Sequence, residues 1–414
     1  MEVIFLIVAV TILFYGLFSN YLTKSVLSAP LTFVAAGLIV SQLGILANGE
    51  QWRDAIKHLA EITLVIMLFT DASRIDLRLV GKQYGIPIRL LGIGLPLTVV
   101  LGALLARLII PELAFWEAAL LGAILAPTDA ALGQPVVASE SVPKRIRQTL
   151  NVESGLNDGI VVPIVMLCAA LATATTDAGE SSQWLGYWIA QVSLGPIVGI
   201  LVGCLGAWGL ELATRSGWME GSFRRLSGVA LAIVAWAVAT EIGNGFLAAF
   251  SAGVAVGYLS NEIKPAIQDF AETEGQLLAL VTFFLFGALL LPDAIAAASL
   301  NHYIYAVMSL TLIRMLPVAL VLLGTGFRWS TIGFIAWFGP RGLASLIFAL
   351  LVFNEHNSAG SETILHSVVI TASLSVLLHG ITAAPAAKWY GNLMSTPACR
   401  EGCEHHEMEP PSRN

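Results

Sequence analysis

Thirteen stretches of this 414-residue chain are apolar over 16 to 31 residues, and only short polar segments separate them. A helix needs about 20 apolar residues to cross the hydrocarbon core of a bilayer. In that core only helices and closed barrels satisfy their own backbone hydrogen bonds. We therefore predict an all-α integral membrane protein with about 13 transmembrane helices. The predicted segments are 3–19, 26–46, 56–72, 86–110, 115–137, 150–175, 184–214, 225–241, 245–260, 273–292, 302–325, 330–354 and 364–388.

The composition supports the membrane class and excludes others. Hydrophobic residues make up 57% of the chain and charged residues only 12%, whereas a soluble domain carries about 25% charged residues. The net charge of −7 offers no basic surface to nucleic acid. The first residues lack a basic region and a small-residue cleavage site, so they are interpreted as a spanning helix rather than a removed signal.

The basic residues predict an orientation. Alternate loops and the C-terminal tail hold sixteen of the 21 Lys and Arg residues, whereas the opposite loops and helix ends hold only Arg53, Lys57 and Arg107. Cytoplasmic loops carry the excess of Lys and Arg. We therefore place the N-terminus outside and the C-terminus in the cytoplasm, in a plasma (inner) membrane.

Two of the predicted helices are interrupted by proline and glycine. The fifth breaks at Pro127 and the twelfth at Gly339–Gly342. Five and twelve differ by an odd number, so these helices run in opposite senses, as in inverted repeats whose substrate sites lie where the breaks meet. We predict a transporter domain over 1–390, with repeats at about 1–175 and 225–390 joined by a linker helix at 184–214. Residues 391–414 form a short polar tail, expected to be disordered.

Two carboxylates lie at membrane depth beside this irregular backbone. Asp158 is in the apolar helix 150–175, and Asp129 follows Pro127 by two residues. An ionisable residue in a bilayer costs about 2.5–3.5 kcal/mol on insertion scales, and such residues are kept for function. Pro127 frees carbonyls upstream, and a freed carbonyl such as that of Thr128 is a hard oxygen ligand. The pattern predicts a cation site.

The polar residues of helix 150–175 divide into two groups. Ser154, Asn157 and Asp158 are spaced i, i+3 and i+4 and share one face. Glu153 points about 140° away from Asp158, so it needs its own partner, and a buried carboxylate stays ionised when it is paired. Two arginines, Arg314 and Arg341, lie inside helices, and we predict a structural pair between Glu153 and Arg314. The alternative is that Glu153 is a further ion ligand.

These residues carry a resemblance to a known family. The run Glu153-Ser154-Gly155-Leu156-Asn157-Asp158 resembles the ES-x-x-ND signature of sodium/proton antiporters, in the branch of NhaP and the NHE exchangers. Pro127-Thr128-Asp129 is similar to that family's discontinuous-helix motif, and Gly339-Pro340-Arg341-Gly342 resembles its GLRG element. Arg314 matches an arginine of the family's preceding helix, and residues 66–82 resemble its third helix.

The resemblance implies a fold and a set of roles. The fold is NhaA-like, with inverted repeats and two discontinuous crossing helices, and forms a homodimer in which a core bundle moves against a rigid dimerisation domain. The acid matching Asp158 binds both cation and proton, and the acid matching Asp129 lies in the same site. Further oxygens come from the backbone of Thr128 and from Ser154.

Two positions bear on the details of transport. The match to Asn157 holds the broken helices together, and family members with Asn there are generally electroneutral. Asp71 falls where some relatives have a glutamate that reaches the ion through water. Its shorter side chain and the Ala130 that follows Asp129 depart from the family pattern.

The physical chemistry of two buried acids favours exchange. Desolvation raises the pKa of a carboxylate, and a second acid nearby raises it further. Such a site holds a proton until a cation replaces it, which suffices for antiport if only the occupied protein switches sides. We predict a secondary transporter, not an enzyme, that exchanges Na⁺ or Li⁺ for H⁺ across the bilayer without a cofactor. A K⁺/H⁺ antiporter is the alternative, and an intramembrane aspartyl protease a remote one.

Cys and His residues outside this constellation give weaker signals. The tail holds Cys399, Cys403, His405 and His406, which are zinc-ligand types at an unusual spacing, and a tail without metal is expected. The remaining histidines are interpreted as packing or interfacial residues. They are His58, His302, His356, His366 and His379.

Overall fold

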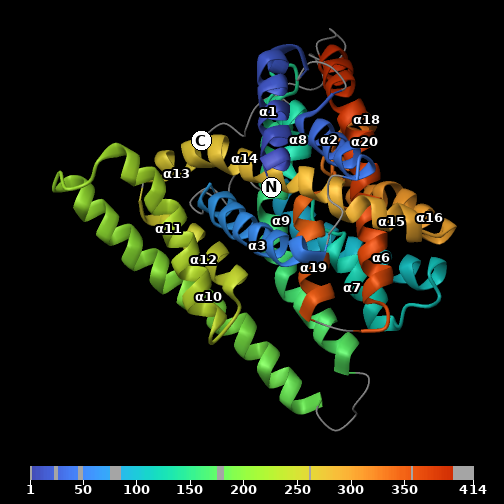
Figure 1. Cartoon of the computed structure of the whole chain (residues 1–414), viewed down its shortest axis with the longest axis horizontal. Helices are drawn as coiled ribbons and strands as arrows, with labels where there is room; N and C mark the ends of the chain where they lie inside the picture. The colour runs from blue at the N-terminus through green and yellow to red at the C-terminus, as the bar shows by residue number, and fades with distance from the viewer. Residues whose placement is uncertain are drawn as a thin grey trace.

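The chain folds as a bundle of helices in the structure, a computed structural model (Figure 1). The structure describes residues 2–22, 27–44, 50–74, 85–174, 181–260, 263–355 and 358–394. Every regular element in these ranges is helical. The prediction of an all-α chain is therefore confirmed for the part that the structure describes.

The helices follow one another in the predicted order. The first ten are α1 (Glu2–Leu22), α2 (Ala29–Gln42), α3 (Glu50–Ser73), α5 (Gly85–Arg89), α6 (Leu95–Ile109), α7 (Phe115–Ile124), α8 (Ala130–Val137), α9 (Lys144–Ala174), α10 (Ser181–Arg215) and α11 (Gly221–Thr240). The others are α12 (Gly245–Leu259), α13 (Lys264–Phe270), α14 (Gln276–Leu285), α15 (Leu291–Ala297), α16 (Leu300–Met308), α17 (Arg314–Leu322), α18 (Trp329–Trp337), α19 (Leu343–Glu355) and α20 (Ser361–Met394). Five-residue π-helical turns join some of them: η1 (Leu90–Gly94), η2 (Ala271–Gly275), η3 (Phe286–Leu290) and η4 (Ser309–Ile313).

Each predicted apolar segment coincides with one helix or with one interrupted helix. Among the described residues, seven helices are long and apolar enough to cross a membrane, and several shorter apolar helices accompany them. The π-helical turns were not predicted, because a wider turn leaves the hydrophobicity of a segment unchanged. The protein is a multi-pass membrane protein.

The helix that carries Glu153–Asp158 starts earlier than predicted. It begins at Lys144 rather than near residue 150, so the motif lies inside the helix and not at its start. Pro143 explains the early start, because proline is tolerated at the beginning of a helix and its carbonyl accepts bonds from Ile146 and Arg147. Helix α20 likewise continues to Met394, beyond the predicted tail boundary at 391. The Cys/His tail and His356 lie outside the described residues.

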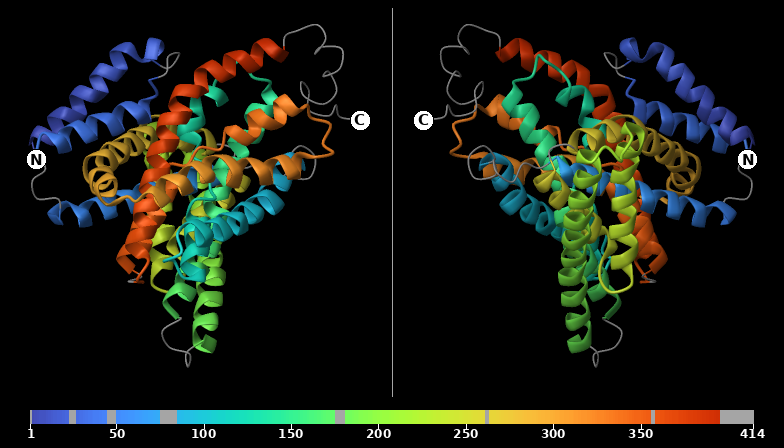
Figure 2. Two further views of the ribbon diagram at one scale, coloured as in Figure 1. Left: turned by 90° about the vertical axis from the view of Figure 1, so that its right-hand side faces the viewer. Right: turned by 90° about the vertical axis from the view of Figure 1, so that its left-hand side faces the viewer.

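Glycines allow close packing in the group formed by α3, α10, α11 and α12, which lie together on one side (Figure 1). A Cβ at Gly199 of α10 would overlap the carbonyl oxygen of Ala248 in α12, and one at Gly253 of α12 would overlap that of Phe69 in α3. Small residues at these contacts are typical of helices that pack within a membrane. Elsewhere in the fold, the end of α9 and the start of α10 project beyond the neighbouring helices (Figure 2).

The outward faces of the helices are apolar. Exposed side chains include Leu104 and Leu108 of α6, and Leu201, Leu205 and Trp208 of α10. In water such faces would be unfavourable, but lipid tails are as apolar as leucine. The polar side chains are instead gathered in the interior, around the two interrupted helices.

Candidate functional site

The two interrupted helices cross and bind each other directly through their breaks. The first break separates α7 from α8, and the second separates α18 from α19. The backbone N–H of Asp129 donates to the carbonyl of Pro340 at 2.8 Å. Gly342 permits this approach, since a Cβ there would overlap the carboxylate of Asp129. The crossing therefore depends on a glycine as well as on Pro340.

The carboxylate of Asp129 sits at the starts of two helices. Its Oδ1 accepts from the N–H groups of Ala131 at 2.8 Å and Leu132 at 3.4 Å, at the beginning of α8. Its Oδ2 accepts from the N–H of Leu343 at 2.7 Å, the first residue of α19. Helix N-termini carry a partial positive charge and stabilise anions. Asp129 is thus a buried carboxyl group whose two oxygens both accept from backbone amides.

Arg341 binds the C-terminal end of α7, on the other side of the first break. Its Nη1 donates to the carbonyls of Ala126 at 2.5 Å and Pro127 at 2.9 Å, where α7 ends, and its side chain is fully buried. A cation is stabilising beside the negative end of a helix. The sequence predicts that carbonyls freed by Pro127 bind the ion, but those of residues 126 and 127 already accept from an arginine.

Glu153 and Arg314 form a buried ion pair. Nη1 of Arg314 lies 2.5 Å from Oε1 of Glu153, and Nη2 lies 3.0 Å from Oε2, so the contact is bidentate. The guanidinium also packs on Gly339, where a Cβ would overlap its Nε. Planar bidentate pairing is the strong form of an arginine–carboxylate contact. The pair joins the motif helix α9 to α17 and to the second break.

The shared polar face of α9 lies against the first break. The Thr128 and Ser154 hydroxyls are 2.9 Å apart, and Nδ2 of Asn157 donates to Oγ1 of Thr128 at 2.7 Å. Two oxygens on this part of α9, Oδ1 of Asn157 and Oδ1 of Asp158, are buried without a hydrogen-bond partner among the described residues. Buried acceptors without donors are rare in proteins, so these two oxygens are candidate ligands for a cation.

Asp71 reaches the same region from α3. A Cβ at Gly155 of α9 would lie 3.5 Å from the Cβ of Asp71, so the two helices are in contact there. Oδ1 of Asp71 is 3.9 Å from Nη1 of Arg74 in the next turn. Asp71, Asp129 and Asp158 are near enough for their charges to interact. The structure therefore brings three carboxylates of different helices into one neighbourhood.

The donor set fits a hard cation better than a transition metal. In the described part of the chain, no group of three or more His, Cys, Asp or Glu side chains is arranged to hold a metal ion. The oxygens present come from carboxylates, hydroxyls and an amide, which suit alkali and alkaline-earth ions.

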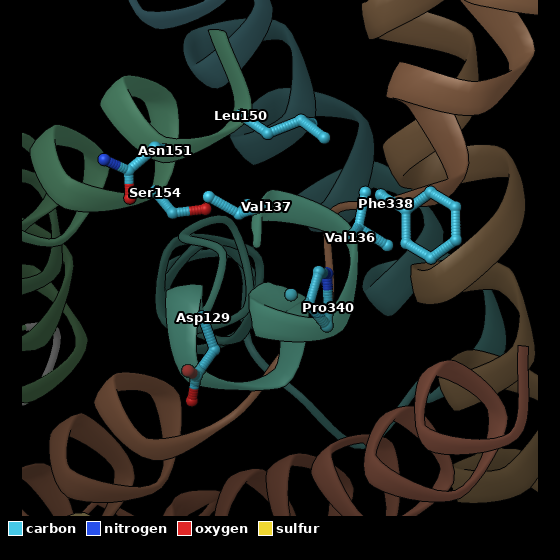
Figure 3. A pocket seen from close by; sticks show the side chains of 9 residues that line it. Asp129, Val136, Val137, Leu150, Asn151, Ser154, Phe338 and Pro340 are labelled. Atoms are coloured by element: carbon cyan, nitrogen blue, oxygen red, sulfur yellow. The ribbon is translucent and has the colours of Figure 1, made fainter. Parts of the chain in front are cut away.

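Asp129 lines a small hollow (Figure 3). Asn151 and Ser154 of α9 line one side and Phe338 lies across from them. Asn151 was not among the predicted site residues, although its spacing of three from Ser154 and seven from Asp158 places it on the same helical face. The face is thus polar from the hollow down to Asp158.

Comparison with known proteins decides the family. A sequence model described as "Sodium/hydrogen exchanger, transmembrane" matches residues 5–389. The chain belongs to this family. Members of the sodium/hydrogen exchanger family are transporters, so the aspartyl-protease alternative is wrong.

Similar proteins are named for different cations. The K⁺/H⁺ antiporter NhaP of Alkalimonas amylolytica is 28% identical over 380 residues, covering 89% of this chain and 64% of the relative. A protein of Schizosaccharomyces pombe named "Probable Na(+)/H(+) antiporter" is 24% identical over 275 residues, covering 63% and 35%. The chain thus spans less than two thirds of the length of these curated relatives.

A solved structure shows the same fold. The sodium proton antiporter MjNhaP1 of Methanocaldococcus jannaschii, at pH 8, superposes with a TM-score of 0.77 at 19% identity. The match covers 94% of this chain and 97% of that one. The likeness extends the family assignment to the arrangement of the helices.

Proposed function

We propose that this chain is a secondary antiporter that exchanges a monovalent cation for protons by alternating access. The observation that carries the proposal is Asp158, a buried carboxylate whose Oδ1 has no hydrogen-bond partner among the described residues. It lies on the polar face of α9 with Ser154 and Asn157, beside the crossing of the interrupted helices. In transporters, substrate sites lie at such crossings.

The three acids have different partners, and this difference supports exchange at a single carboxylate. Glu153 is neutralised by Arg314, and Asp129 by the amides at the starts of α8 and α19. Asp158 alone lacks such a fixed partner among these three. A lone charge buried in a membrane is unfavourable, so Asp158 is neutral by protonation or by a bound cation. Proton and cation then exclude each other, which couples their movement in opposite directions.

The proposed ligands are oxygens of α9 and of the first break. Asp158 and Asp129 supply charge, and Ser154 and Thr128 supply hydroxyl or carbonyl oxygen. Asn157 holds α9 to the first break through Thr128, and Asp71 contributes negative charge from α3. We propose Na⁺ or Li⁺ as the cation, on the few oxygens available. K⁺ is the second candidate, because similar proteins are named K⁺/H⁺ antiporters.

We further propose the orientation and assembly. The hollow at Asp129 is lined on one side by Leu150, Asn151 and Ser154 of α9, and the start of this helix carries Lys144, Arg145 and Arg147. The positive-inside rule assigns this end to the cytoplasm, so the hollow is the cytoplasmic access path. The protein acts in the plasma membrane as a homodimer, with its C-terminus in the cytoplasm.

Purified protein in proteoliposomes with a trapped pH dye tests the proposal. An imposed pH gradient should collapse on addition of NaCl, LiCl or KCl, with saturable kinetics, and should persist with choline chloride. Asp158→Asn should abolish the response, while Glu211→Gln, which changes an exposed pair on α10, should retain it. A wild-type protein that releases no protons with any alkali cation would refute antiport. Full activity of Asp158→Asn would refute the site.

A further inference from the structure

One face of α20 is polar where it passes the second break. Ser375, His379 and Thr382 are spaced i, i+4 and i+7, so they lie along one side of the helix. Ser375 contacts the backbone of Arg341 in the segment between α18 and α19, and His379 and Thr382 contact Trp337, the last residue of α18. Ser375 and His379 are buried, with 0% and 1% of their surface exposed.

Each of these side chains holds a different group of the break. Oγ of Ser375 accepts from the backbone N–H of Arg341 at 2.7 Å. Nε2 of His379 is 2.9 Å from the carbonyl oxygen of Trp337, the last residue of α18. Oγ1 of Thr382 accepts from the indole N–H of Trp337 at 3.0 Å.

Both ring nitrogens of His379 face backbone carbonyls. Nε2 lies 2.9 Å from the carbonyl oxygen of Trp337, and Nδ1 lies 3.0 Å from the carbonyl oxygen of Ser375 in its own helix and 3.2 Å from the Ser375 hydroxyl. A carbonyl can only accept, so the contact with Trp337 is a hydrogen bond when Nε2 carries the hydrogen. In that form the Ser375 hydroxyl, which accepts from Arg341, can donate to Nδ1, and the contacts run from Arg341 through Ser375 and His379 to Trp337.

The chain of contacts ends at the proposed ion site. Arg341, whose amide is held by Ser375, donates from its side chain to the end of α7. Two residues later, the N–H of Leu343 donates to Asp129. The backbone between Trp337 and Leu343 thus has one end fixed by His379 and the other bound to a carboxylate of the site.

We propose that His379 and Ser375 are positioning residues, which fix the backbone of the second break so that Leu343 meets Asp129 and Arg341 meets the end of α7. This proposal rests on the proposed antiport. The interrupted backbone leaves polar groups without helical partners inside the membrane, where each unsatisfied group costs several kcal/mol. Ser375 satisfies the amide of Arg341, and His379 gives a second contact to the carbonyl of Trp337, which also accepts from the N–H of Gly339. These side chains of α20 act from outside the crossing, and so set its geometry without contacting the cargo.

Packing alone would be a different role for the same histidine. The ring of His379 stacks on Trp337 with centroids 5.1 Å apart and an interplanar angle of 29°. A purely packing residue would tolerate loss of the hydrogen bond as long as volume is retained. A positioning residue requires a donor at the place of Nε2. Two substitutions therefore separate these roles: one places an amide nitrogen where Nε2 was, and the other places it where Nδ1 was.

The decisive comparison is His379→Gln against His379→Asn. The amide nitrogen of Gln can reach the place of Nε2 and donate to Trp337, whereas the amide of Asn reaches only the place of Nδ1. We expect His379→Asn to raise the apparent KM for the cation about tenfold, the effect of about 1.4 kcal/mol, and His379→Gln to restore the wild-type value. Thr371→Val is the control, since this buried α20 hydroxyl bonds to Ser367 of its own helix.

Hydrogen–deuterium exchange gives a readout that needs no transport. In His379→Asn the amides between residues 337 and 345 should exchange faster than in the wild type, and in His379→Gln they should not. Equal exchange and equal KM in both variants would overturn the proposal, as would equal losses in both with lowered melting temperature. If wild-type protein transports nothing but the exchange difference is found, the antiport proposal fails while the positioning of the break stands.

Discussion

Asp129 of the first interrupted helix accepts a hydrogen bond at 2.7 Å from the backbone N–H of Leu343 in the second. The same carboxylate accepts from two amides of its own helix α8, so it links two helix starts through one negative charge. Asp158 differs, because its Oδ1 has no partner among the described residues. The two acids therefore differ in their contacts: Asp129 links the two interrupted helices, and Asp158 keeps an oxygen without a partner, as the proposed exchange requires.

This difference predicts unequal effects of the same substitution. In Asp129→Asn the new NH₂ group must face at least one backbone N–H, so a hydrogen bond to a charged group, worth about 1.5–3 kcal/mol, is lost. We expect a lower melting temperature as well as loss of exchange. Asp158→Asn removes no such bond and should abolish exchange with little change in melting temperature. Thermal unfolding in detergent, followed by tryptophan fluorescence, measures both.

Equal melting temperatures for the two variants would contradict this assignment. Asp129→Glu is a useful companion, because it keeps the charge but moves it by one methylene. It should weaken the link to Leu343, and exchange should fall without being lost entirely.

The pair of Glu153 and Arg314 predicts a second contrast. Removing one partner of a buried pair leaves an uncompensated charge and costs about 3–5 kcal/mol. Arg314→Ala should therefore lower the yield of folded protein more than Asp158→Asn does, and Glu153→Gln should also destabilise. Glu211→Gln, which breaks an exposed pair with Arg215 on α10, should change stability by about 0.3–0.5 kcal/mol at most. Size-exclusion profiles and melting temperatures provide the comparison.

The double substitution Glu153→Leu/Arg314→Met sharpens this test. Apolar replacements of both partners are often neutral for stability. A stable double variant that still exchanges would identify the pair as structural. A stable but inactive one would favour the alternative that Glu153 takes part in ion binding.

Hydropathy and residue chemistry predict the helices, the two breaks and the buried ion pair, each for a physical reason. The apolar segments predict the helices because a helix of about 20 apolar residues is long enough to cross the hydrocarbon core of a bilayer. Pro127 and Pro340 favour breaks because proline removes a backbone donor from a helix, and the polar residues beside them distinguish these sites from the prolines inside α9, α10 and α20. The pairing of Glu153 with an arginine follows from the shortage of other cations at depth, which leaves Arg314 and Arg341 as the two candidates.

The remaining features depend on three-dimensional placement. No local pattern reveals that Asp129 faces the amide of Leu343, since the two are far apart in the chain and meet only through the crossing. The same holds for Arg341 and the carbonyls of Ala126 and Pro127. His379 was interpreted as a packing residue, and its spacing from Ser375 and Thr382 was the signal available in the sequence.

Gly159, next to Asp158, predicts a packing effect between α9 and α12. A Cβ at this position would overlap the ring of Phe250, including the atom nearest the backbone. Overpacking of this kind costs about 1–3 kcal/mol, so Gly159→Ala should lower both melting temperature and exchange rate. Gly209→Ala of α10, with nothing within 4 Å of the new Cβ, is the matched control. Adding Phe250→Leu to Gly159→Ala should recover part of the loss, and no recovery would locate the defect elsewhere.

The last prediction concerns charge balance. Asn157 cannot ionise, Glu153 is bound by Arg314, and Asp129 is bound by three amides. If Asp158 alone changes its occupant, each cycle moves one proton against one monovalent cation, and no net charge crosses the membrane. Thiocyanate, a permeant anion, dissipates any membrane potential without adding a candidate substrate. The initial rate of cation-driven proton movement in proteoliposomes should therefore be the same with and without it, and a cation jump on a solid-supported membrane should give no sustained current. Acceleration by thiocyanate would refute one-for-one exchange, and would mean that a second carboxylate, Asp129 or Asp71, also gives up its proton during the cycle.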